Sequence, residues 1–266
     1  MPTLAQTLIT SVDANSAEAE NYKKAQQPIT VTATRSENTL SSLDSNLSVV
    51  TSEDIAFINQ QHVNQAIVFV PGGWISRGNG QEHLTAIRSP VLTGAGGCGA
   101  FYIAQDSISL RAPGFCNANQ LFDANTEQAD RIEVLRGPSS TLYGSNAVHG
   151  VINVITPTPF EQSNAYVGAT FGPNDYLSGQ FSAGKTGQQH AFMVLGNLSH
   201  DGGYKDDSGF EQQKLNVIHQ FQDDQLNIKS VFSITNLNQE TAGFINGENA
   251  YQNNSVKRNN PTPEAF

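Results

Sequence analysis

The stretch from Arg131 to Thr156 constrains the fold of this chain more than any other feature. Two short alternating apolar runs, residues 132–135 and 151–155, flank a connector that is rich in Gly, Pro and Ser. Glycine in such a connector permits tight turns and close approach of the backbone. The pattern predicts two strands that clamp a compact connector.

This stretch resembles the hallmark of the plug domain of TonB-dependent outer-membrane receptors, R-I-E-V-L-R-G-P-x-x-x-L-Y-G-x-x-A-x-G-G-V-I-N-x-I-T. Only His149 departs from it, where the family usually has a second glycine. The resemblance implies an α+β plug domain, a small mixed sheet with short helices, followed by antiparallel strands of a transmembrane β-barrel.

Composition excludes several other classes of protein. With 14 Lys and Arg against 24 Asp and Glu, the net charge of -10 opposes binding to nucleic acid. No run of 18 apolar residues is present, so a transmembrane helix is not expected. The six histidines are scattered and no nucleophile lies in a recognisable elbow, so we expect neither an enzyme nor catalytic residues.

No cofactor or metal site is expected either. Residues 94–99 satisfy G-x-G-x-x-G, but a dinucleotide site needs a strand before this motif and a helix after it. Pro90 breaks the preceding run and residues 101–110 have a strand pattern, so this segment is interpreted as a loop at the outward tip of the plug.

The N-terminal part divides into two segments. Residues 1–27 lack a cationic region and a sustained apolar core, so no signal peptide is visible and a mobile tail is predicted. Residues 28–35 are an extended, β-branched segment that resembles the TonB box, the peptide that the energy-transducing protein grips. Its residues are Pro28, Ile29, Thr30, Val31, Thr32 and Ala33. By itself the pattern also fits an ordinary first strand.

Residues 36–157 are predicted to form the plug domain. A strand at 47–51 precedes a helix capped by Ser52, whose apolar stripe continues to the Pro71-Gly72-Gly73 stop. In the strand at 84–89, Ser89 stands in the glycine place of the family's I-R-G. Ser107 likewise replaces the glycine that follows the family's apolar strand, so the chain is interpreted as a divergent branch.

Two arginines and a set of loop residues are the candidate functional positions of the plug. The resemblance implies that Arg88 and Arg136 pair with glutamates on the barrel wall and lock the plug in place; exposed strand ends are the alternative. The candidates for ligand contact are Arg77, Asn79, Gln81, Thr93, Gly94, Gly96 and Gly97.

The two cysteines, Cys98 and Cys116, bracket the predicted tip. An even pair in an exported chain favours a disulfide, worth roughly 3 kcal/mol for a loop of this length. Two buried free thiols are the alternative.

Residues 158–266 are predicted to be the N-terminal part of a barrel. Apolar and polar residues alternate over five segments, at 165–172, 175–184, 190–199, 211–221 and 225–236. Long connections alternate with short turns, as outer-membrane barrels require. Plugged transporters use about 22 strands, so the chain is expected to be a fragment.

These features predict a TonB-dependent receptor of the Gram-negative outer membrane that imports a scarce ligand, most simply a ferric siderophore. Its expected partners are a TonB-type energy-transducing protein, outer-membrane lipid and the small-molecule ligand. The alternatives are a truncated, transport-incompetent periplasmic binding module, or a receptor for cobalamin, saccharide or peptide.

Overall fold

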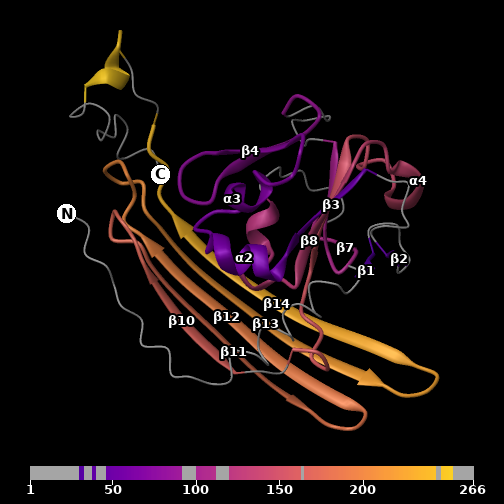
Figure 1. The fold of residues 1–266 in the computed structure, drawn as a ribbon. Helices are drawn as coiled ribbons and strands as arrows, with labels where there is room; N and C mark the ends of the chain where they lie inside the picture. Colours follow the sequence, from indigo (N-terminus) through magenta and orange to yellow (C-terminus); the bar gives the residue numbers. More distant parts are fainter. Residues whose placement is uncertain are drawn as a thin grey trace, which may run out of the picture.

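The computed structural model describes residues 30–32, 38–39, 46–91, 100–111, 120–162, 165–243 and 247–253. A small mixed part is followed by a five-stranded antiparallel sheet. In Figure 1 the mixed part, indigo to magenta, lies against the concave face of this sheet, orange to yellow. The predicted fold class, an α+β domain followed by antiparallel strands, is confirmed.

The mixed part, which we call the plug, is built on a sheet of strand order β3-β8-β9-β6-β7. Its strands are β3 (Leu47–Thr51), β6 (Phe101–Gln105), β7 (Ile108–Ser109), β8 (Arg131–Arg136) and β9 (Gly150–Ile155). β6 is parallel to β9, and the other neighbours are antiparallel. Two further antiparallel pairs are β4 (Gly73–Arg77) with β5 (His83–Ile87) and β1 (Thr30–Val31) with β2 (Asn38–Thr39).

The helices of the plug are short. They are α2 (Ser52–Ile58), α3 (Asn64–Ile67) and α4 (Ser140–Tyr143), with 3-10 turns η3 (Gln120–Asp123) and η4 (Thr126–Gln128). Another 3-10 turn, η5 (Ala250–Gln252), follows the antiparallel sheet. Ser52 was the predicted cap of α2, but the cap is Thr51, which exchanges capping-box hydrogen bonds with Asp54. Asn59, with a left-handed φ of 46°, ends α2 and separates it from α3.

The plug sheet buries apolar residues on both faces. Ile132 and Val134 of β8 belong to the main core, which α2 and α3 cover. Leu135, on the other face, belongs to a smaller cluster with Val31 and Tyr143. The strands of this sheet are therefore apolar at successive positions, as expected of strands covered on both sides.

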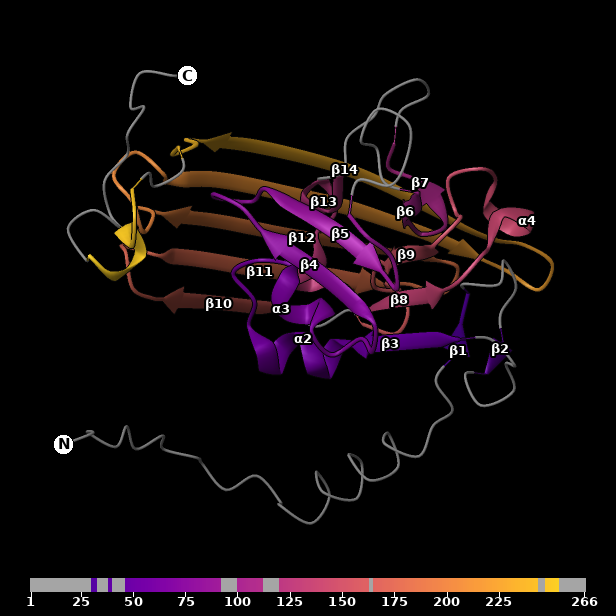
Figure 2. The same ribbon diagram turned by 90° about the horizontal axis from the view of Figure 1, so that it is seen from above.

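The second part is a sheet in which each strand pairs with its neighbours in the chain (Figure 2). Its strands are β10 (Tyr166–Phe171), β11 (Leu177–Thr186), β12 (His190–Asp201), β13 (Phe210–Gln222) and β14 (Asn227–Gln239). All five predicted strands are present within a few residues of their expected bounds. We call the end with the short turns 187–189 and 223–226 the inner end, and the opposite end the outer end.

Side chains of this sheet alternate between the plug and the outer surface. On β12, Met193 and Leu195 face the plug and are buried, whereas Phe192 and Leu198 point outward and are about half exposed. Further exposed apolar side chains on the sheet's strands include Val167, Phe171, Leu177, Phe181, Val217, Ile228, Phe232 and Ile234. Among the described residues, no helix is long and apolar enough to cross a membrane.

Candidate functional site

The motif of residues 131–156 forms the centre of the plug as β8, α4 and β9. Gly150 begins β9 where a Cβ atom would lie 2.5 Å from the carbonyl oxygen of Leu135, so the pairing of β8 with β9 requires glycine there. Gly137 has a φ of 108°, which side chains rarely adopt. His149, the departure from the family pattern, packs beside Phe101 with ring centroids 5.8 Å apart. The motif thus forms the structural centre of the plug, on which the contacts described below are built.

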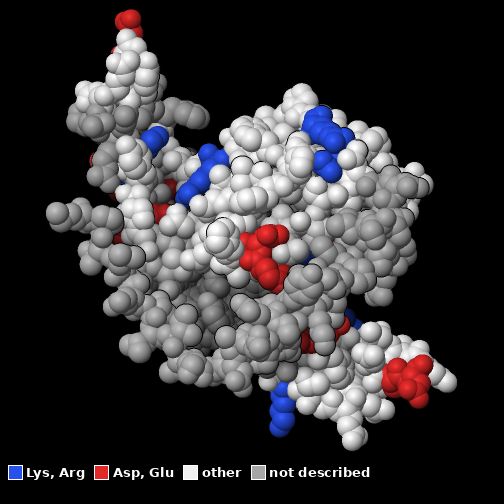
Figure 3. Space-filling view, in the orientation of Figure 1, with Lys and Arg blue, Asp and Glu red and all other residues white. Residues whose placement is uncertain are grey.

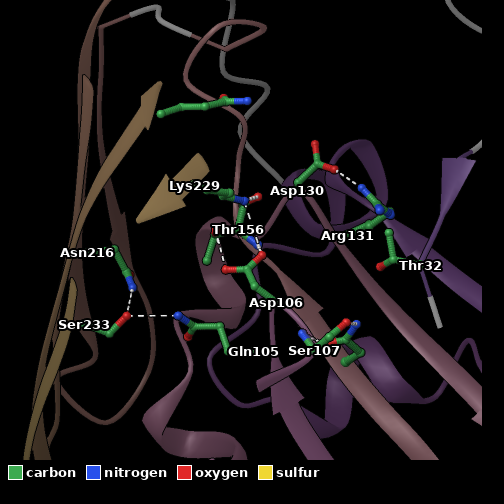
Figure 4. Close-up of polar contacts among 12 residues, drawn as sticks. Thr32, Gln105, Asp106, Ser107, Asp130, Arg131, Thr156, Asn216, Lys229 and Ser233 are labelled. Atoms are coloured by element: carbon green, nitrogen blue, oxygen red, sulfur yellow. Dashed lines mark hydrogen bonds and ion pairs between the residues drawn. The ribbon is translucent and has the colours of Figure 1, made fainter. Parts of the chain in front are cut away.

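A charged contact joins the plug to β14 at the inner end. Lys229 lies 3.2 Å from the carboxylate of Asp106 and donates a 2.7 Å hydrogen bond to the carbonyl of Thr156. Thr156 donates to Asp106 through its hydroxyl at 2.7 Å and its backbone N–H at 3.1 Å (Figure 4). Asp106 and Ser107 both have positive φ, which explains why glycine suits the place of Ser107.

A polar contact lies next to it. Ser233 of β14 accepts hydrogen bonds from the side-chain amides of Gln105 at 2.9 Å and Asn216 at 2.6 Å (Figure 4). Gln105 belongs to the plug strand β6 and Asn216 to β13, so one hydroxyl joins the plug to two strands of the sheet.

A buried ion pair crosses the middle of the interface. Lys214 of β13 lies 2.9 Å from the carboxylate of Glu127, with side chains 2% and 8% exposed. Its ammonium also donates to the carbonyl of Ala124 at 2.9 Å. Lys214 and Glu127 were not among the residues predicted from the sequence; the signal that could have indicated them is a lysine on the polar face of a predicted strand.

Thr32 contacts the plug at the inner end. Its backbone N–H lies 3.0 and 3.1 Å from the two carboxylate oxygens of Glu133, and its hydroxyl lies 3.3 Å from both. Glu133 is completely buried and also accepts a 2.8 Å hydrogen bond from Arg131. Figure 4 shows Thr32 beside Arg131. A cavity of about 1270 Å³ borders both residues and extends to Lys229.

At the outer end, a cavity of about 290 Å³ is bordered by the β4–β5 hairpin and the outer connections of the sheet. Arg77 borders it, with its guanidinium 3.8 Å from Asp201 and 33% exposed. Asn79 also borders it and donates to the carbonyl of Ala242 at 2.8 Å. Gln81 is buried nearby and does not line the cavity. Its backbone N–H donates to the side chain of Gln239 at 3.0 Å.

Arg88 and Arg136 lie together at the edge of the plug. Both donate to Asn46, and Arg136 also donates to the carbonyl of Pro71 at 2.7 Å. Burial, and then the nearby charge of Arg88, lower the pKa of Arg136. Neither forms an ion pair with a carboxylate in the described part of the chain. On the face of the molecule that Figure 3 draws, the basic side chains lie in small separate groups.

Two buried histidines support the outer hairpin. The rings of His62 and His83 meet edge to face with centroids 5.6 Å apart. Burial, followed by the charges of His83 and Arg77, lowers the pKa of His62 to about 3. Burial also lowers the pKa of His83 to about 4, against the opposing effect of its bond to the carbonyl of Gln81. Both rings are therefore neutral at pH 7.

Several predicted positions lie outside the described residues. They are Pro28, Ile29, Ala33, Thr93, Gly94, Gly96, Gly97 and both cysteines, Cys98 and Cys116. Across the described ranges, no group of three or more His, Cys, Asp or Glu side chains is arranged to hold a metal ion.

The structure is thus a plug packed against the concave face of an open antiparallel sheet, whose other face exposes apolar side chains. Residues 39–151 match the family model of the TonB-dependent Receptor Plug Domain. These residues are a plug domain of the TonB-dependent receptor family.

Solved structures of other proteins share this fold. The pyoverdine outer membrane receptor of Pseudomonas aeruginosa matches 80% of this chain and 31% of its own, with a TM-score of 0.64 and 16% identity. The ferric yersiniabactin uptake receptor of Yersinia pestis matches 74% and 32%, with a TM-score of 0.58 and 18% identity. A copper transporter matches 77% and 32%, with a TM-score of 0.59 and 16% identity. The chain spans about a third of the length of these proteins.

Proposed function

We propose that this chain supplies the plug, residues 36–157, and the first barrel strands, from residue 158, of a receptor in the Gram-negative outer membrane. The receptor imports a scarce small molecule, with the plug as its energy-coupled gate. The match of residues 39–151 to the plug family carries this proposal. The exposed apolar outer face of β10–β14 supports contact with membrane lipid.

The plug must be held in the barrel and then moved. The adjacent guanidiniums of Arg88 and Arg136, with no carboxylate partner among the described residues, suit pairing with glutamates elsewhere on the barrel wall. The ion pairs of Lys214 and Lys229 hold the plug on the sheet. Pro28–Ala33 is the segment that a TonB-type energy-transducing protein would pull, by adding a strand to it.

A ferric siderophore is the proposed cargo. Two of the compared receptors are described as receptors for pyoverdine and for ferric yersiniabactin, which supports this class. The copper transporter has the same fold, so the test includes copper. Arg77 and Asn79 would contact the ligand at the outer cavity, with the loop 93–97 and the neighbouring Gln81. A positive, partly exposed guanidinium suits an anionic chelate.

The test is uptake of radioactive iron by cells of the source organism under iron limitation. Deletion of the gene is expected to abolish uptake from at least one ferric siderophore in a panel, and the intact gene is expected to restore it. Parallel arms supply copper, cobalamin and labelled saccharides. Unchanged iron uptake from every siderophore would contradict the proposed cargo. If deletion abolishes uptake only in the copper, cobalamin or saccharide arm, the cargo is reassigned to that class.

A further inference from the structure

The hydrogen bonds of Thr32 with Glu133 join residues that are 101 positions apart in the chain. Glu133 lies in the middle of β8, between Val49 of β3 and Asn153 of β9. A carboxylate at the centre of a sheet and completely buried requires donors, because burial of an unsatisfied charge is costly. Thr32 supplies two of them, and Arg131 supplies the third.

The residue before Thr32 is also tied to the plug. Val31 is completely buried and packs in the smaller apolar cluster with Leu47, Leu135 and Val151. Its backbone pairs with Asn38 of β2. The segment Thr30–Thr32 therefore covers one face of the plug sheet, with one backbone edge paired and the next N–H bonded to Glu133.

We propose that Glu133 is a positioning residue that holds the segment Thr30–Thr32 closed against the plug. A partner that adds a strand to this segment needs its free backbone groups, and the Thr32 N–H is occupied by Glu133. The segment must therefore leave Glu133 before the partner binds fully. This inference rests on the proposed function, because the partner is the TonB-type protein.

The surroundings of Glu133 suit reversible release. The inner cavity borders Thr32 and Arg131, so water can enter when Thr32 leaves and can replace its donors. Arg131, which also pairs with Asp130 at 2.6 Å, stays beside the carboxylate. Glu133 is thus bonded to protein in the closed state and to Arg131 and water in the open state.

Hydrogen exchange of the full chain, without any partner, tests the closed contact. In Glu133→Gln, which weakens the charge-assisted bonds, amides of residues 30–32 are expected to exchange about tenfold faster. Thr32→Val removes only the hydroxyl and leaves the Arg131 pair intact, so its smaller increase should be in the same direction. Glu161→Gln is the matched control, because this exposed carboxylate lines the same cavity. Its exchange at residues 30–32 should be unchanged.

Exchange of residues 131–136 reports whether the plug sheet stays folded. If it does, unchanged exchange at 30–32 in Glu133→Gln would overturn the proposal. If Glu133→Gln unfolds, the test passes to Thr32→Val, in which unchanged exchange at residues 30–32 would likewise overturn the proposal. A second arm measures affinity for the periplasmic domain of a TonB-type protein, expected to rise about tenfold in Glu133→Gln. If exchange is faster but no variant binds the TonB-type domain, Glu133 still holds the segment and the TonB-type partner is contradicted. If exchange is faster but the affinity for that domain is unchanged, the role of Glu133 in partner access is refuted.

Discussion

Lys214 and Glu127 form an ion pair at 2.9 Å that is almost completely removed from water, between the centre of β13 and the plug. The ammonium also bonds to a plug carbonyl, that of Ala124. Its three acceptors all belong to the plug, so this one side chain orients the turn η4 against the sheet. Complete hydrogen bonding is what makes a buried charge tolerable.

Breaking this pair from one side is expected to destabilise the chain strongly. Lys214→Met leaves the carboxylate of Glu127 buried without its cation, which costs about 3–5 kcal/mol. The double variant Lys214→Met/Glu127→Leu should recover most of this loss, because no buried charge remains. Denaturant unfolding of the full chain in detergent measures both. Lys185→Met, an exposed lysine of β11, is the control and should change stability little.

Gly150→Ala is expected to destabilise the plug by about 1–3 kcal/mol, through overpacking. The added carbon would lie 2.5 Å from the carbonyl of Leu135 and 3.0 Å from Ile87. Gly179→Ala on β11 is the matched control, because nothing lies within 4 Å of its added carbon. Equal melting temperatures for the two variants would contradict this account.

The plug is expected to become less stable as the pH is lowered below 6.5, because of His62 and His83. Their folded-state pKa values, about 3 and about 4, lie below the ordinary 6.5, so the unfolded chain takes up their protons first. Their contribution is complete above pH 6.5 and is lost as the pH falls toward 4. The slope is about 1.4 kcal/mol per pH unit for each histidine.

Unfolding titrations at pH 7 and pH 5 measure this effect. His62→Gln should have a shallower pH dependence than the parent chain, whereas His200→Gln, an exposed site on β12, should keep it. The same slope in His62→Gln and the parent would refute the assignment.

Arg77→Gln is expected to weaken binding of an anionic ferric chelate about tenfold, since it removes one charge-assisted contact. The guanidinium of Arg77 is partly exposed at the outer cavity. Its loss leaves in place the hydrogen bonds that Asn79 and Gln81 make to Ala242 and Gln239. Fluorescence quenching with the chelate found in the uptake assay gives the affinity. Lys185→Gln, near the inner end, should bind as the parent chain does.

Most of the fold was predictable because it follows local patterns. The motif at 131–156 indicated β8 and β9, and strict alternation indicated β10–β14. The cap of α2 was misplaced by one residue, since Thr51 and Ser52 both have capping side chains. The break at Asn59 was missed because a left-handed residue leaves no periodic signal.

The site was only partly predictable. Arg77 and Asn79, both predicted to contact the ligand, border one cavity, and that role stays a prediction. The pairs Lys214 with Glu127 and Lys229 with Asp106 were not foreseen, because they depend on how the plug is seated on the sheet. The two residues of each pair are 87 and 123 positions apart in the chain, so no local sequence pattern connects them.

The strand order of the plug sheet also has a consequence for the order of folding. β6 is parallel to β9, and β3 pairs with the distant β8, so this sheet cannot close before residue 155 is available. β10–β14, in contrast, form from consecutive hairpins, whose local contacts form quickly. The contact of Thr32 is made to Glu133 of β8, so it cannot form before that strand is in place. A pull on the N-terminal segment would therefore reach this contact before it reaches the pairing of β8 with β9.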